Sequence, residues 1–259
     1  MIKISVKANN DAFKTDYRLL IQQNRPVKLF FFMNLEALIN LFFPKVCNAC
    51  KNHLSDNEVF LCTDCRHVLP ITNFHKNNDP FVKNIFYGRA QIEAATALLR
   101  FEKKGIVQHL LHQLKYGQNE AVSDFFGQWL GEELSACEDY KTVDLVIPVP
   151  LYPKKLKKRG YNQVTKFGQN IAKALDIVYS EDLLTKITTS TSSQASKTRL
   201  ERWQLNNETF SITHLHKLEN KHILLVDDII TTGNTLEACI LELNKAKNIK
   251  ISVAAIAIA

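Results

Sequence analysis

The sequence contains no Gly-Lys pair, and this absence excludes one large class of nucleotide-binding protein. The phosphate-binding loop of P-loop hydrolases ends in Gly-Lys-Ser or Gly-Lys-Thr, so the chain is not such an enzyme. It also has no internal repeat and no interdomain linker rich in proline or glycine. Its densest apolar segment, Leu29 to Phe43, is interrupted by Glu36 and is shorter than the ~20 residues of a membrane span. We therefore expect an amphipathic helix there and no transmembrane segment.

A secretory signal peptide is also lacking. With six cysteines in the chain, this indicates a reducing, cytoplasmic compartment where cysteines bind metal instead of forming disulfides. The 259 residues suffice for one large domain and a small module. The net charge of +7 favours polyanionic partners, either nucleic acid or phosphorylated small molecules. A mildly basic protein without such a partner remains the alternative.

The stretch from Lys221 to Ala238 predicts a strand, a turn and a helix. Ile223 to Val226 form a continuous apolar run, typical of a strand buried on both faces. Asp227 and Asp228 follow at its carboxyl end, where open α/β sheets bind ligands. A helical pattern then continues to about Lys247.

The turn in this stretch has the chemistry of a phosphate site. Gly233 can adopt backbone angles closed to other residues, and a helix N-terminus offers unpaired N–H groups. Asp227 and Asp228 could then accept hydrogen bonds from two ribose hydroxyls. The alternative is a buried strand, an acidic turn and an ordinary helix. The full pattern from Ile223 to Thr235 resembles the phosphoribosyl-pyrophosphate (PRPP) signature of type I phosphoribosyltransferases.

Two Cys-x2-Cys pairs, separated by eleven residues, predict a metal site. Tetrahedral zinc takes four thiolates, and each pair supplies two of them. The expected ligands are Cys47, Cys50, Cys62 and Cys65. With four protein ligands no position is left open, so the zinc is structural. It would let a short segment with little core fold.

The remaining elements are predicted from apolar patterns. Residues 81–101 suggest a strand pair, and residues 105–117 and 124–134 suggest amphipathic helices. A strand over residues 144–150 should lie parallel to the Ile223 strand.

A basic loop at residues 154–159 should meet a pyrophosphate, with a solvated lysine-rich loop as the alternative, and a helix should follow to Leu175. Residues 183–187 and 251–259 suggest strands, and residues 188–198 a mobile loop.

Four motifs together resemble the ComF/GntX family of phosphoribosyltransferase-like competence proteins. They are FFPKVCNAC with its second CxxC, HQLKYG, IPVPLYPKKLKKRGYNQ and ILLVDDIITTGNT. The resemblance implies an α/β fold: a type I phosphoribosyltransferase-like parallel sheet flanked by helices, with a small N-terminal zinc-binding module. It divides the chain into a weakly ordered, dispensable extension (1–32), an amphipathic helix plus four-cysteine zinc module (33–80) and a phosphoribosyltransferase-like domain (81–259).

The resemblance also implies site roles. Asp227 and Asp228 match the catalytic pair that binds the ribose hydroxyls. The 5′-phosphate turn corresponds to Thr231, Thr232, Gly233, Asn234 and Thr235. The pyrophosphate side corresponds to Pro150, Leu151, Arg159, Gly160, Asn162 and Gln163. A Gln-x4-Arg-x2-Arg pattern matches Gln194, Arg199 and Arg202, although Leu205 replaces the Asn of many members.

Members of the family are implicated in handling single-stranded DNA during natural transformation. The resemblance thus implies PRPP with magnesium and single-stranded DNA as ligands, and a competence helicase and recombination mediators as partners. Tyr161 or Trp203 could stack on bases. A base-salvage transferase and a non-catalytic PRPP sensor are the alternatives, and the reaction stays open. The apolar segment Ile251 to Ala259 leaves little room for base recognition, which disfavours salvage.

Overall fold

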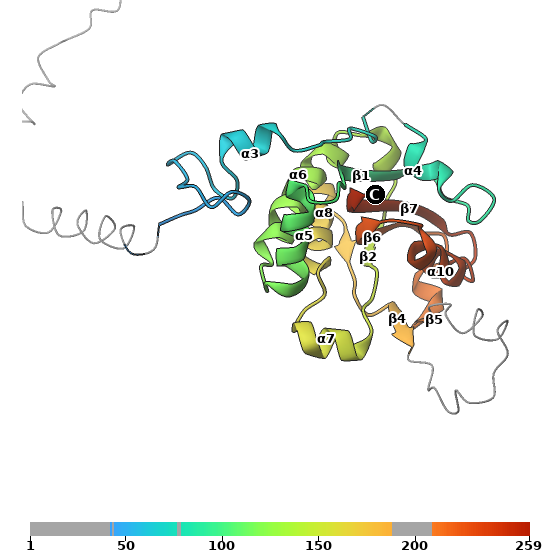
Figure 1. Cartoon of the computed structure of the whole chain (residues 1–259). Coiled ribbons are helices and arrows are strands. Elements are labelled where there is room, and N and C mark those ends of the chain that lie inside the picture. The colour runs from blue at the N-terminus through green and yellow to red at the C-terminus, as the bar shows by residue number, and fades with distance from the viewer. Residues whose placement is uncertain (1–41, 43, 77–78, 188–208) are drawn as a thin grey trace, which may run out of the picture.

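A parallel sheet forms the centre of the protein, in a computed structural model that describes residues 42, 44–76, 79–187 and 209–259. Five strands follow the order β1-β7-β6-β2-β3, and all neighbouring pairs are parallel (Figure 1). The strands are β1 (Ala95–Arg100), β2 (Leu145–Pro148), β3 (Val178–Tyr179), β6 (His222–Ile230) and β7 (Lys250–Ile258). This confirms the predicted α/β class.

The central strands are apolar because both of their faces are covered. In β6, Leu224 and Val226 pack into the cluster on one face, while Ile223 and Leu225 pack into the cluster on the other. Strand β7 lies between β1 and β6, and its residues also pack into both clusters: Ala254 and Ile256 into the first, Val253 and Ala255 into the second. A continuous apolar run is the pattern expected of such doubly buried strands.

Helices cover the two faces of the sheet as separate layers (Figure 1). One layer contains α5 (Ile106–Tyr116), α6 (Ala121–Ser135) and α8 (Thr165–Leu175), and the other contains α4 (Phe81–Asn84) and α10 (Asn234–Leu243). Helices α6 and α8 approach closely at Gly127, where a Cβ atom would lie 2.7 Å from Cα of Phe167.

The cysteine-rich segment, with helix α3 (Thr63–His67), packs on the first layer. Phe60 stacks on Phe125 of α6 with ring centroids 4.7 Å apart, and Cys47, Leu61 and Leu69 belong to the same core cluster. The small module thus shares a core with the main domain.

Two of the predicted elements were wrong. Residues 81–101 do not form a strand pair: α4 and a turn precede β1, which pairs with β7. The basic loop is a helix, α7 (Pro153–Arg159), which starts at a proline suited to a first helical position and ends at Gly160 with φ 84°. The strand expected over residues 183–187 is present as β4 (Leu184–Ile187), but it pairs antiparallel with β5 (Thr209–Ile212) outside the main sheet.

The leader and most of the apolar segment from Leu29 to Phe43 lie outside the described residues. In the described ranges, every helix is too short or too polar to cross a bilayer.

Candidate functional site

The acidic pair lies at the carboxyl edge of the sheet. Strand β2 pairs with β6 as far as Pro148, opposite Val226, and the N–H of Val149 then donates to the carbonyl of Val226 at 2.8 Å. Asp227 and Asp228 come next in β6, partly exposed at the place where β2 leaves the sheet. The strand itself continues beside β7 to Ile230, past the end that the apolar run predicted.

The turn after β6 leads directly into α10. Gly233 is buried and has φ 76°, a left-handed conformation that favours glycine, and the helix begins at Asn234. Thr231, Thr232 and Asn234 are exposed around it. Because the first N–H groups of a helix have no intrahelical acceptor, this turn combines free N–H groups with hydroxyl and amide side chains. It can bind an anion.

Lys115 is a site residue that sequence reasoning missed. It lies in the last turn of α5, and its Nζ is 2.8 Å from Oδ1 of Asp228. Both side chains are largely shielded, with 24% and 13% of their surface exposed, so the pair is only partly screened by water. The HQLKYG motif was the available signal, but its spacing says nothing about a contact with β6.

The residues predicted for the pyrophosphate side lie at the same edge of the sheet. Asn162 donates from Nδ2 to the carbonyl of Val149 at 3.0 Å, which fixes the turn after α7 beside the end of β2. Pro150 and Leu151, the next residues of the chain, are partly exposed there.

The residues around the turn after α7 differ in how exposed they are to solvent. Gln163 is 1% exposed, and its side chain contacts Arg159 and the carbonyl of Tyr161. Arg159 is partly exposed above the ring of Tyr116, 5.5 Å from its centroid, and Gly160 is exposed. Gln163 therefore supports the turn from within, whereas Arg159 is partly open to solvent.

The Gln-x4-Arg-x2-Arg residues, Gln194, Arg199 and Arg202, lie outside the described residues, as does Trp203. They belong to the connection between β4 and β5. Their predicted role stays a prediction.

The four predicted metal ligands come together. The sulfur atoms of Cys47, Cys50, Cys62 and Cys65 all lie within 4.8 Å of one another, and those of Cys50 and Cys62 are 3.7 Å apart. A tetrahedron with Zn–S bonds of ~2.3 Å has an edge of about 3.8 Å, so the donor set fits zinc. His53 and His67, which lie close to these cysteines in the sequence, are exposed.

The electrostatics of the cluster also suit a cation. Burial acts to raise the pKa of Cys47, but N–H groups of Cys50, Cys62 and Ala49 overcome it and lower the pKa to about 6. For Cys65, burial and the neighbouring sulfur atoms raise the pKa. Ionisation of one thiol therefore disfavours ionisation of the next. A bound cation would offset the repulsion between the thiolates.

Residues 165–258, from α8 to the end of β7, match the phosphoribosyl transferase domain family. Together with the parallel sheet, this match defines the class: a phosphoribosyltransferase-like α/β protein. A purine phosphoribosyltransferase from Pyrococcus horikoshii Ot3 is 22% identical, with 53% of this chain and 73% of that chain covered at a TM-score of 0.34.

The curated relatives of the chain include competence proteins and a DNA utilization protein. Competence protein F of Haemophilus influenzae is 30% identical over 96 residues, 37% of this chain and 42% of that protein. Competence protein ComFC of Streptococcus pneumoniae is 33% identical over 156 residues, 54% of this chain and 65% of that protein. The DNA utilization protein YhgH of Escherichia coli K12 is 24% identical, with 49% and 56% covered. The chain thus spans about half the length of the curated relatives it matches. Over these lengths the chain is similar to competence proteins of the ComF type, and residues 165–258 match the phosphoribosyl transferase domain.

Proposed function

We propose that the protein binds PRPP with magnesium at the carboxyl edge of the sheet and handles single-stranded DNA during natural transformation. One observation carries the PRPP assignment: Asp227 and Asp228 lie between the end of β2 and the Gly233 turn that starts α10. A sugar phosphate held at the turn has its ribose hydroxyls beside the two carboxylates. Its pyrophosphate then lies toward Pro150 and the α7 turn.

The chemistry that suits this arrangement is displacement of pyrophosphate from the ribose C1 by a nitrogen base. The reaction passes through an oxocarbenium-like state, so the protein need not supply a nucleophile. Its residues hold both ends of the substrate, and Arg159 and the α7 lysines balance charge on the leaving group. Magnesium, when bound, neutralises pyrophosphate oxygens. The ion pair with Lys115 holds the carboxylate of Asp228 in a fixed orientation.

The acidic pair provides the first test. The double variant Asp227→Asn/Asp228→Asn should lose magnesium-dependent PRPP binding, measured by calorimetry with and without magnesium. An amide is close in size to a carboxylate, so the fold should survive while two charged acceptors are removed. Each charged hydrogen bond contributes about 1.5–3 kcal/mol, so affinity should fall at least about a hundredfold. An unchanged affinity would remove the pocket assignment.

The matched control is Asp144→Asn. Asp144 precedes β2 at the opposite edge of the sheet, where it accepts from the N–H of His222 at 2.8 Å. This variant should bind PRPP like the wild type. A screen of bases for pyrophosphate release, using the wild type, then tests for transfer chemistry.

DNA binding has its own structural support. Helix α7 carries four exposed lysines and Arg159, and none of these five is ion-paired with an acidic side chain of the described chain. The ring of Tyr116 is 65% exposed beside Arg159, whereas the hydroxyl of Tyr161 is bound to the carbonyl of Leu114. Basic residues beside an exposed aromatic ring suit single-stranded DNA, because the basic residues pair with its phosphates and the ring stacks on its bases. Tyr116 thus replaces Tyr161 as our choice for base stacking.

A further inference from the structure

The back of the 5′-phosphate turn is tied to a distant segment, the connection between α4 and β1. Arg89 donates to the carbonyl of Thr232 at 2.9 Å and to Oδ1 of Asn234 at 2.7 Å. It forms a close ion pair with Glu237 in the first turn of α10. It also donates to the carbonyl of Ile85 at 3.3 Å. One guanidinium group therefore connects the turn, the helix start and its own segment.

The same connection packs directly against the turn. A Cβ atom at Gly233 would lie 2.9 Å from Cγ2 of Ile85 and 3.2 Å from Cε1 of Phe86. Phe86 is fully buried, so this side of the turn cannot yield easily. Ile85 and Phe86 therefore give the turn a fixed support at Gly233.

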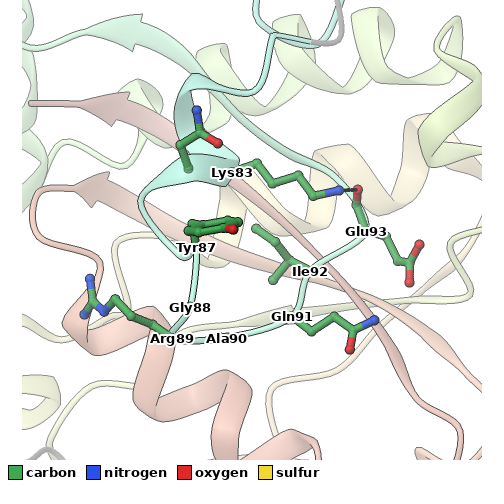
Figure 2. A pocket seen from close by; sticks show the side chains of 9 residues that line it. Lys83, Tyr87, Gly88, Arg89, Ala90, Gln91, Ile92 and Glu93 are labelled. Atoms are coloured by element: carbon green, nitrogen blue, oxygen red, sulfur yellow. Dashed lines mark hydrogen bonds between the residues drawn. The ribbon is translucent and has the colours of Figure 1, made fainter.

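Arg89 stands at the rim of an open depression of about 550 Å³. Figure 2 shows Tyr87, Ile92 and Glu93 around this depression, whereas the side chain of Arg89 extends away from it. The guanidinium group of Arg89 contacts the turn before α10, and neighbouring side chains line the depression.

We propose that Arg89 is a positioning residue for the 5′-phosphate of a ribose 5-phosphate ester. The inference rests on the function proposed above for the same turn. By holding the carbonyl of Thr232 and the side-chain oxygen of Asn234, Arg89 fixes the turn with its N–H groups and hydroxyls toward the anion. Glu237 balances the guanidinium charge, so Arg89 acts through the shape of the turn and not as a direct phosphate ligand.

Two ligands separate this role from a general effect on folding. Ribose 5-phosphate probes the turn, and magnesium pyrophosphate probes the other end of the site, which Arg89 does not touch. In Arg89→Ala, calorimetry should show ribose 5-phosphate affinity reduced about tenfold, equivalent to removing roughly one charged hydrogen bond. Pyrophosphate affinity should stay within about twofold. Arg89→Lys keeps a positive charge for the ion pair with Glu237 but cannot donate from two fixed nitrogen atoms. Its affinity for ribose 5-phosphate should lie between those of Arg89→Ala and the wild type.

Lys83→Ala is the matched control, because Lys83 lines the same depression and donates to the carbonyl of Glu93 at 2.9 Å without touching the turn. It should leave both affinities unchanged. The inference fails if Arg89→Ala and Arg89→Lys bind ribose 5-phosphate as the wild type does, or if both ligands weaken equally. Wild-type protein that binds neither ligand would instead refute the proposed function, and the inference with it.

Discussion

A single buried histidine should make the stability of the protein depend on pH. The side chain of His75 is fully buried, with Nε2 2.8 Å from a carboxylate oxygen of Glu133 and Nδ1 3.3 Å from Oγ1 of Thr96. Burial lowers the pKa of His75, the carboxylate of Glu133 opposes this, and Lys76 adds to the lowering. The folded protein therefore keeps this imidazole neutral at pH values where an unfolded chain would protonate it.

The sign follows from proton linkage. The unfolded state binds the extra proton as pH falls through about 6.5, so folding loses stability on the acid side of that value and keeps it above. Between pH 7.5 and 5.5 the free energy of unfolding should therefore fall less in His75→Gln than in the wild type. Urea unfolding at several pH values measures this. His112→Gln, on the exposed face of α5, should match the wild type, and equal slopes for His75→Gln and the wild type would contradict the role of His75.

At the scale of elements, α7 should determine the affinity for single-stranded DNA. Removing one lysine that binds a phosphate lowers the slope of log affinity against log salt by about 0.7. The variant Lys157→Gln/Lys158→Gln should therefore bind a fluorescent oligothymidine more weakly, with a slope reduced by about 1.4. Anisotropy titrations over a range of salt concentrations measure both quantities.

The control for this experiment is Lys217→Gln/Lys247→Gln. It removes the same charge from exposed lysines at the opposite edge of the sheet, near the starts of β6 and β7. If affinity and slope fall equally in both double variants, the net charge of the protein accounts for binding and α7 has no special part.

Local elements were predictable where the signal was local. The apolar run, the acidic pair and the glycine of the β6–α10 unit stand next to one another in sequence, as do the two cysteine pairs. The strand pair predicted over residues 81–101 was wrong because the buried side chains of residues 81–94, such as Val82, Phe86 and Ile92, pack against distant elements and not across a hairpin. The contacts of Lys115 with Asp228 and of Arg89 with Thr232 join segments more than a hundred residues apart, and no spacing in the sequence encodes them.

At the scale of the whole molecule, zinc should stabilise more than its own module. Phe60 and Leu61 from the cysteine-rich segment belong to the core formed with α5 and α6. Cys47→Ser/Cys62→Ser should lose the expected equimolar zinc, measured by elemental analysis, and should unfold at a lower temperature because part of that shared core loosens. Cys137→Ser, a cysteine outside the cluster, should keep its zinc. Zinc retained in the double variant would overturn the ligand set.

The central place of β7 has a consequence for biosynthesis. Ala95 of β1 pairs with Val253 of β7, which is translated long afterwards. Strand β6 pairs with β7 along the opposite edge of that strand. At ribosomal rates of roughly 5–20 residues per second, β1 emerges about 8–30 s before that partner does. Until then both strands present unsatisfied hydrogen-bonding edges to the cell. The sheet therefore cannot close until β7 has left the ribosome, and until then the edges of β1 and β6 stay open to pairing with other chains.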